Sequence, residues 1–158
     1  MMSKARRGFT LIELMVVVVI VAILAAVGIS AYNNYIEDAK RTEAQTALAD
    51  IASKQEAYAN TWGTYINIAA WNPSTVPGNE KASAAWEVGD EFKDWDVLGF
   101  AITGPARWSY AVKADDSSYV VGACRKRGEN MLSLHLSSAN RRTVIEGTAT
   151  IVTGFACP

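Results

Sequence analysis

An unbroken apolar run near the N-terminus constrains this chain more than any other feature. Residues 9–29 read FTLIELMVVVVIVAILAAVGI, and Glu13 is the one charged residue among them. As a helix, this run spans about 30 Å, which matches the hydrocarbon core of a bilayer. Lys4, Arg6 and Arg7 precede the run, and such a basic flank stays on the cytoplasmic side. The sequence therefore predicts a helix that enters the membrane with its N-terminus in the cytoplasm.

Glu13 has two readings at this point. A carboxylate in hydrocarbon costs several kcal/mol unless it has a partner, which makes Glu13 a candidate functional residue. Alternatively, Glu13 lies at headgroup level, where the start of a helix favours a negative charge. A secretory signal peptide is the rival interpretation of the whole run, with AILAA at 22–26 as its cleavage site. We favour an anchor, because the run is long for a signal core and contains an acid.

The helical pattern continues well beyond the apolar run. Mostly apolar residues recur at steps of three and four, which places them on one helix face. They are Ala44, Leu48, Ile51, Gln55, Tyr58 and Trp62. We expect a single helix of about 54 residues from Phe9 to Trp62, apolar all round at first and amphipathic afterwards. Gly63 is its predicted C-cap.

The remainder of the chain reads as a small sheet domain. Turn signals and a short helix near Ala82–Val88 are expected first. Strand-like runs then follow at Val97–Thr103, Arg107–Ala114, Tyr119–Cys124, Met131–Ser137 and Thr143–Val152. Short turns between such runs favour an antiparallel meander, with its apolar face on the amphipathic half of the helix. The predicted fold class is therefore α+β.

The N-terminal residues also carry a family resemblance. RRGFTLIELMVVVVIVAILAAVGISAYNNY closely resembles the N-terminus of type IV prepilins: glycine, aromatic, TLIEL, then an apolar helix. The resemblance implies the pilin fold, in which a long N-terminal helix, transmembrane then amphipathic, packs on a C-terminal antiparallel sheet. It implies that prepilin peptidase cuts between Gly8 and Phe9 and methylates the new amine of Phe9. It also implies that Glu13 pairs with the N-terminal amine of a neighbouring subunit during assembly.

The resemblance also implies the parts into which the chain divides and its location in the cell. The expected parts are a leader (1–8), a transmembrane and assembly helix (9–30), an amphipathic helix (31–62), a loop region (63–96) and an antiparallel sheet with a disulfide-bounded C-terminal region (97–158). The part of the chain after the transmembrane helix would lie in the periplasm, held by the inner membrane, until the subunit joins an extracellular filament. Its expected partners are prepilin peptidase, the inner-membrane assembly machinery, and further pilins, of its own or another kind.

Cys124 and Cys157 are the two cysteines of the chain. In a domain outside the cytoplasm, a disulfide between them is the simplest reading. Two buried free thiols are the alternative if the domain is cytoplasmic. Neither cysteine lies in a CxxC pair, so the sequence predicts no metal site.

Charge does not point to a nucleic-acid partner. The chain has 15 basic and 16 acidic residues, which is not the footprint of a general nucleic-acid binder. The charges are nevertheless uneven, since Glu80–Asp96 is acidic and Arg125–Arg142 is basic. These segments are either two solvated surfaces or complementary patches on neighbouring subunits. Contact of the basic patch with DNA or another polyanion is a third reading.

No pattern indicates an enzyme or a cofactor. The one histidine, His135, falls opposite the leucines of its predicted strand and is expected to face solvent. No serine or cysteine has an evident base partner, and no phosphate-binding loop is present. We therefore expect a structural pilus subunit, major or minor, serving adhesion, twitching motility or DNA uptake. The alternatives are a pseudopilin of a type II secretion system and a signal-anchored periplasmic binding module that never assembles.

Overall fold

The computed structural model describes residues 9–77, 83–127, 130–139, 147–148 and 157. Its helices are α1 (Leu11–Trp62) and α2 (Lys93–Leu98), with a 3-10 turn at Asp90–Phe92 before α2. Its strands are β1 (Ile68–Asn72), β2 (Ala84–Ala85), β3 (Pro105–Ala106), β4 (Ser109–Ala114), β5 (Tyr119–Arg127), β6 (Asn130–Ser137) and β7 (Gly147–Thr148). The chain divides into two compact units, residues 1–39 and 40–158.

The N-terminal unit contains the first part of α1. The side chains of residues 9–29 are all exposed within the chain, although nearly all of them are apolar. A helix that is apolar all round needs lipid or neighbouring helices rather than water. Among the described residues, α1 is the one helix whose length and composition would let it cross a membrane.

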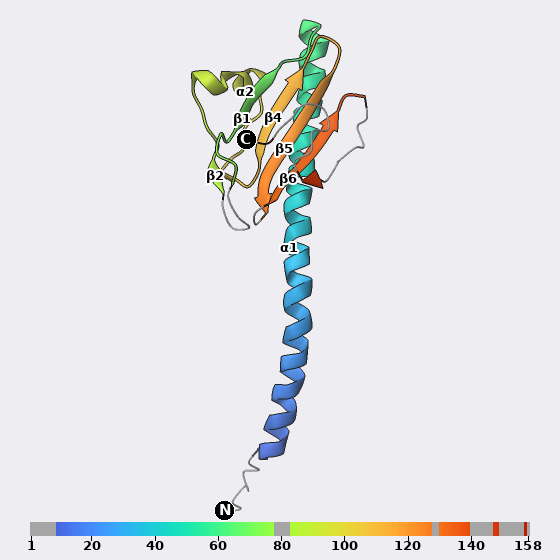
Figure 1. Cartoon of the computed structure of the whole chain (residues 1–158), viewed down its shortest axis with the longest axis vertical. Coiled ribbons are helices and arrows are strands. Elements are labelled where there is room, and N and C mark those ends of the chain that lie inside the picture. The colour runs from blue at the N-terminus through green and yellow to red at the C-terminus, as the bar shows by residue number, and fades with distance from the viewer. Residues whose placement is uncertain (1–8, 78–82, 128–129, 140–146, 149–156, 158) are drawn as a thin grey trace, which may run out of the picture. The chain divides into compact units, whose positions relative to one another are not determined.

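The C-terminal unit, which we call the head, is built on a five-stranded antiparallel sheet. The strand order is β1-β4-β5-β6-β7, and β2 and β3 form a separate two-stranded ribbon. Strands β4, β5 and β6 follow one another as hairpins, as the turn spacing predicted. Figure 1 shows these strands running alongside the C-terminal half of α1. The predicted packing of an antiparallel sheet on the amphipathic half of the helix is confirmed.

The core lies between this sheet and residues 44–55 of α1. Trp108, Tyr110 and Val112 share one face of β4 and its approach, and all three are fully buried, as their alternation predicted. The rest of the core comes from β5, β6 and the helix, chiefly Tyr119, Val121, Ala123, Leu134, Leu136, Ala44, Leu48 and Ile51. Because each large apolar side chain removed from water contributes about 1.5–3 kcal/mol, this cluster supplies most of the stabilisation of the head.

A side-chain clamp explains the polar break in the apolar face of α1. Gln55 is fully buried. Its amide nitrogen donates to the Ile66 carbonyl at 2.8 Å, and its amide oxygen accepts from the Ile66 N–H at 3.0 Å. Both polar ends of Gln55 are therefore satisfied, and the loop after α1 is tied back to the helix.

The C-terminal end of α1 lies where the sequence predicted it. Gly63 adopts a positive φ of 79°, and its N–H donates to the Ala59 carbonyl at 2.8 Å. Trp62, however, is not a core residue, because 69% of its surface is exposed. Its ring contacts Tyr58, with 6.2 Å between the ring centroids.

The predicted strand Val97–Thr103 is wrong, because its first residues end helix α2. Trp95 and Leu98 are both buried, and a spacing of three places them on one side of a helix. Gly99 then ends α2 with a φ of 73°. Its N–H donates to the Asp96 carbonyl and the Phe100 N–H donates to the Trp95 carbonyl, both at 3.0 Å. This pattern is a glycine-terminated helix end, not a strand start.

The expected loop region 63–96 contributes a strand to the sheet. Strand β1 pairs antiparallel with β4, with Ile68 opposite Val112 and Asn72 opposite Tyr110. The residues of β1 do not alternate between buried and exposed. The period-2 signal of a strand is therefore missing, which is why the sequence did not reveal it.

The predicted short helix near Ala82–Val88 is also wrong. Residues 84–85 form β2, in which Ala84 pairs with Ala106. The following segment is held by Asn72, which donates to the Glu87 carbonyl and accepts from the Glu87 N–H, both at 2.9 Å. Strand pairing of β2 with β3 and the side-chain amide of Asn72 thus take the place of helical hydrogen bonds. Ala82 itself lies outside the described residues.

The last predicted strand, Thr143–Val152, is present only in part. Within it the structure describes Gly147–Thr148, which pair with β6 as β7. The other residues of that prediction lie outside the described part of the chain.

Candidate functional sites

The predicted cleavage site lies at the edge of the described chain. Gly8 and the rest of residues 1–8 are outside the described residues. Phe9 lies two residues before α1 and is 78% exposed. Cleavage between Gly8 and Phe9 and methylation of Phe9 therefore stay predictions.

Glu13 forms a reciprocal cap with Thr10 at the start of α1. The Thr10 N–H and the Thr10 hydroxyl both donate to Oε2 of Glu13, at 2.8 and 2.7 Å. The Glu13 N–H donates back to Oγ1 of Thr10 at 3.3 Å. This is a capping box, which satisfies helix N–H groups that would otherwise have no partner. Threonine followed three residues later by glutamate is the sequence signature of this motif, although it was not among the features predicted above.

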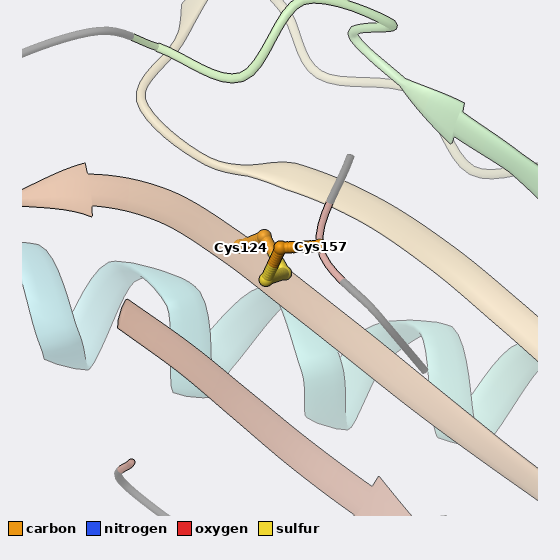
Figure 2. The surroundings of a disulfide bond; sticks show 2 residues. All are labelled: Cys124 and Cys157. Carbon is orange, nitrogen blue, oxygen red and sulfur yellow. A yellow bond between two sulfur atoms is a disulfide. The ribbon is translucent and has the colours of Figure 1, made fainter. Parts of the chain in front are cut away.

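Cys124 and Cys157 form the disulfide that the sequence allowed. Their Cα atoms are 5.9 Å apart, and 33 residues separate them in the chain. Figure 2 shows the bond joining strand β5 to the C-terminal segment. No free cysteine remains.

The disulfide lies on the face of the sheet that points away from α1. Tyr119 on β5 faces the helix, because its hydroxyl donates to the Ala52 carbonyl at 3.3 Å. Alternation along the strand places Cys124 on the opposite face. Ser109 is the cross-strand partner of Cys124 on β4, and it is fully buried, as is Ala111 on the same face of β4. The sheet is thus covered on both sides around this bond.

Arg125 does not belong to a basic surface patch. Only 3% of its surface is exposed, and its guanidinium carbon lies 5.3 Å from the centroid of the Trp108 ring. The Trp108 indole N–H in turn donates to the Lys40 carbonyl at 3.0 Å. Lys126, the next residue on β5, faces out and is exposed. The side chain of Arg127 and the residues at 140–142 lie outside the described part.

His135 does not face solvent, so that prediction is wrong. It does lie opposite the face of Leu134 and Leu136, as expected, but only 8% of its surface is exposed. His135 pairs with Gly122 on β5, on the face that carries the disulfide. Because this second face is also covered, burial lowers the pKa of the imidazole from its usual value.

The acidic segment offers no metal centre in the described residues. Asp90, Glu91 and Asp96 are exposed around the start of α2. Within the described ranges, no group of three or more His, Cys, Asp or Glu side chains could hold a metal ion. Glu80 lies outside those ranges.

Two family models match the chain, and they meet at residue 30. A model of the prokaryotic N-terminal methylation motif matches residues 3–29. A model described as type IV minor pilin ComP, DNA uptake sequence receptor, matches residues 30–133, well over half of the chain.

Curated relatives carry pilin names. Fimbrial protein EcpC of Eikenella corrodens is 28% identical over 145 residues, covering 79% of this chain and 94% of that protein. Type IV major fimbrial protein FimA of Dichelobacter nodosus is 53% identical over 49 residues, covering 31% of this chain and 30% of that protein. Prepilin peptidase-dependent protein D of Escherichia coli strain K12 is 63% identical over 38 residues, covering 24% of this chain and 26% of that protein. No solved structure gives a significant match.

The sequence motif, the fold and these matches agree. The methylation motif covers the apolar helix and its basic flank, and the pilin model covers most of the described head. The chain therefore belongs to the family of the type IV minor pilin ComP and is a structural subunit of a type IV pilus.

Proposed function

We propose that this chain is a minor pilin that takes part in DNA uptake by binding DNA with its head. The observation that carries the proposal is the match of residues 30–133 to the model named for a DNA uptake sequence receptor. The proposal takes up contact with DNA, which the charge balance of the sequence did not favour. The head acts by binding and not by catalysis, in keeping with a family of structural pilins.

The proposed route begins in the inner membrane. The apolar first part of α1 anchors the chain, with the head in the periplasm. Prepilin peptidase then cuts between Gly8 and Phe9 and methylates Phe9, after which the assembly machinery adds the subunit to a filament with other pilins. Mass spectrometry of sheared filaments tests this route. We expect a chain that begins at N-methylated Phe9, and a filament chain that still begins at Met1 would contradict it.

Within the filament, Glu13 is proposed to pair with the N-terminal ammonium of a neighbouring pilin. The support is that Glu13 lies four residues after Phe9, on a helix whose apolar side chains are exposed for packing. An ammonium and a carboxylate are each costly alone among apolar helices, and they are tolerated together. The pairing would fix the register between subunits.

Lys126 is the described side chain best placed to test DNA binding. It is exposed on the outer face of β5, between two arginines in the sequence. Lys113 is an exposed lysine on the neighbouring strand β4. It pairs with Val120 near the start of β5, whereas Lys126 lies near the end of β5. The two lysines are therefore a matched pair on different parts of one sheet.

The test measures binding of labelled double-stranded DNA to the cleaved chain, which begins at Phe9, in detergent and over a series of salt concentrations. We expect Lys126→Gln to weaken binding several-fold and to reduce the salt slope by about 1, as the loss of one phosphate contact does. Lys113→Gln is the control and should change neither. Absence of wild-type binding at about 50 mM salt would contradict the DNA proposal, since phosphate contacts are strongest at low salt.

A further inference from the structure

We propose that Thr10 is a positioning residue for filament assembly, which holds one carboxylate oxygen of Glu13 and leaves the other for the ammonium of a second pilin. This inference rests on the proposed pairing of Glu13 and adds the residue that aims it. Thr10 makes no contact with the incoming subunit in this scheme and acts through Glu13.

The hydrogen bonds of the capping box fall on one side of the carboxylate. Both Thr10 donors, the N–H and the hydroxyl, converge on Oε2 at 2.8 and 2.7 Å. Within the described residues, Oε1 of Glu13 receives no hydrogen bond. A carboxylate has room for about four hydrogen bonds, so Oε1 keeps full capacity for an outside donor. Phe9 and Glu13 are both exposed, so a second chain can reach this oxygen.

The capping box also fixes where the free oxygen points. A glutamate side chain loses rotamer freedom when it becomes ordered, and that loss opposes any pairing which must order it on encounter. Thr10 orders Glu13 before a partner arrives. The charge-assisted bonds to Oε2 further reduce the penalty of carrying a carboxylate at the start of a membrane helix.

The threonine hydroxyl provides two of the three hydrogen bonds. It donates to Oε2, and its oxygen accepts from the Glu13 N–H at 3.3 Å. The third bond uses the backbone N–H of residue 10, which any residue except proline supplies. Thr10→Val keeps the size and branching of the side chain and removes the hydroxyl. Thr10→Ser keeps the hydroxyl and removes a methyl group, so the two variants form a matched pair.

The experiment expresses the full chain with each substitution in the native cells. It measures the amount of the chain in sheared filaments relative to the membrane fraction, and it determines the N-terminus of both pools by mass spectrometry. We expect Thr10→Val to be cut and methylated normally but to enter filaments several-fold less, because Glu13 must then be ordered when the partner arrives. We expect Thr10→Ser to restore incorporation, because it rebuilds both hydroxyl bonds.

Three outcomes would overturn the inference. Normal incorporation of Thr10→Val would show that the hydroxyl is not needed. Failure of Thr10→Ser to rescue would show that the methyl group matters instead. An uncut Thr10→Val chain would place the residue in the cleavage step.

Glu13→Gln separates this inference from the proposed pairing on which it rests. If Glu13→Gln enters filaments fully, the proposed pairing itself is wrong. If Glu13→Gln is excluded from filaments while Thr10→Val enters normally, only the role of Thr10 is rejected.

Discussion

At the scale of single residues, the head buries Gln55 and Arg125 because each polar side chain meets a matching partner. Gln55 breaks an apolar helix face, yet it is fully buried because the backbone of Ile66 matches both ends of its amide. Arg125 looked like a surface charge, yet it packs on Trp108. Alternation identifies one buried face of a strand, but it cannot tell that the second face is buried as well, as it is at Cys124 and His135.

Burial of His135 makes the stability of the head depend on pH. Because burial lowers the pKa of the folded imidazole below its usual 6.5, the unfolded chain binds protons more readily as pH falls. The contribution of His135 is therefore complete above pH 6.5 and is lost as pH falls through the lower folded-state pKa. We expect the unfolding midpoint in urea to decrease between pH 7 and pH 5, with a smaller decrease in His135→Gln.

The measurement uses tryptophan fluorescence of the full chain in detergent, because all five tryptophans lie in the head or at its helix end. Carboxylates titrate in both proteins, so the difference between wild type and His135→Gln isolates the imidazole. Equal slopes against pH in the two proteins would contradict the assignment.

At the scale of elements, the sequence predicts the long helix α1 but not the short helix α2. The apolar run and the steps of three and four predicted a helix from Phe9 to Trp62, and the structure has Leu11–Trp62. The two residues of difference are explained by the capping box of Thr10 and Glu13. Helix α2 has 6 residues, too few for a helical period to show. Gly99 was its one local signal.

Gly99 is expected to be required for the end of α2. Its φ of 73° lies in the left-handed region, which costs a residue with a side chain about 1–2 kcal/mol. Among the described residues, a Cβ at this position would meet only Lys54 Nζ, at 3.9 Å, so backbone strain and not a clash sets the cost. We expect Gly99→Ala to lower the free energy of unfolding of the head by about 1 kcal/mol in a urea titration.

Gly28→Ala is the matched control for this prediction. Gly28 lies inside α1, and a Cβ there would meet nothing within 4 Å in the part of the chain that the structure describes. The substitution should leave head unfolding unchanged. An equal loss of stability in both variants, or no loss in Gly99→Ala, would contradict the role of the positive φ.

At the scale of the whole molecule, the sequence predicted two parts with different sources of stability. The first unit exposes almost all of its apolar side chains and depends on lipid or other helices. The head encloses its own core of aromatic and aliphatic residues. The division could be predicted because the apolar run is continuous. The position of β1 in the sheet and the covering of its outer face could not, since both depend on contacts between distant segments.

The disulfide ties the C-terminus to the centre of this sheet. Cys124 is fully buried on β5, and Cys157 lies 33 residues further along the chain. Closing a loop of this length in the unfolded chain contributes about 3–4 kcal/mol to stability in the loop-entropy model. We expect the double variant Cys124→Ala and Cys157→Ala to lose stability of this order in urea unfolding. The packing of β4, β5 and β6 on α1 does not depend on the bond, so the variant should still fold.

Reduced wild-type chain provides the control, because it lacks the bond but keeps both sulfur atoms. It should unfold within about 1 kcal/mol of the double variant, since the remaining difference is the loss of small buried groups. If reduced wild type were as stable as oxidised wild type while the double variant was not, packing of the sulfur atoms would account for the stability. If both matched oxidised wild type, the C-terminal tether would contribute nothing to the head, and its function would have to lie in contacts with other molecules.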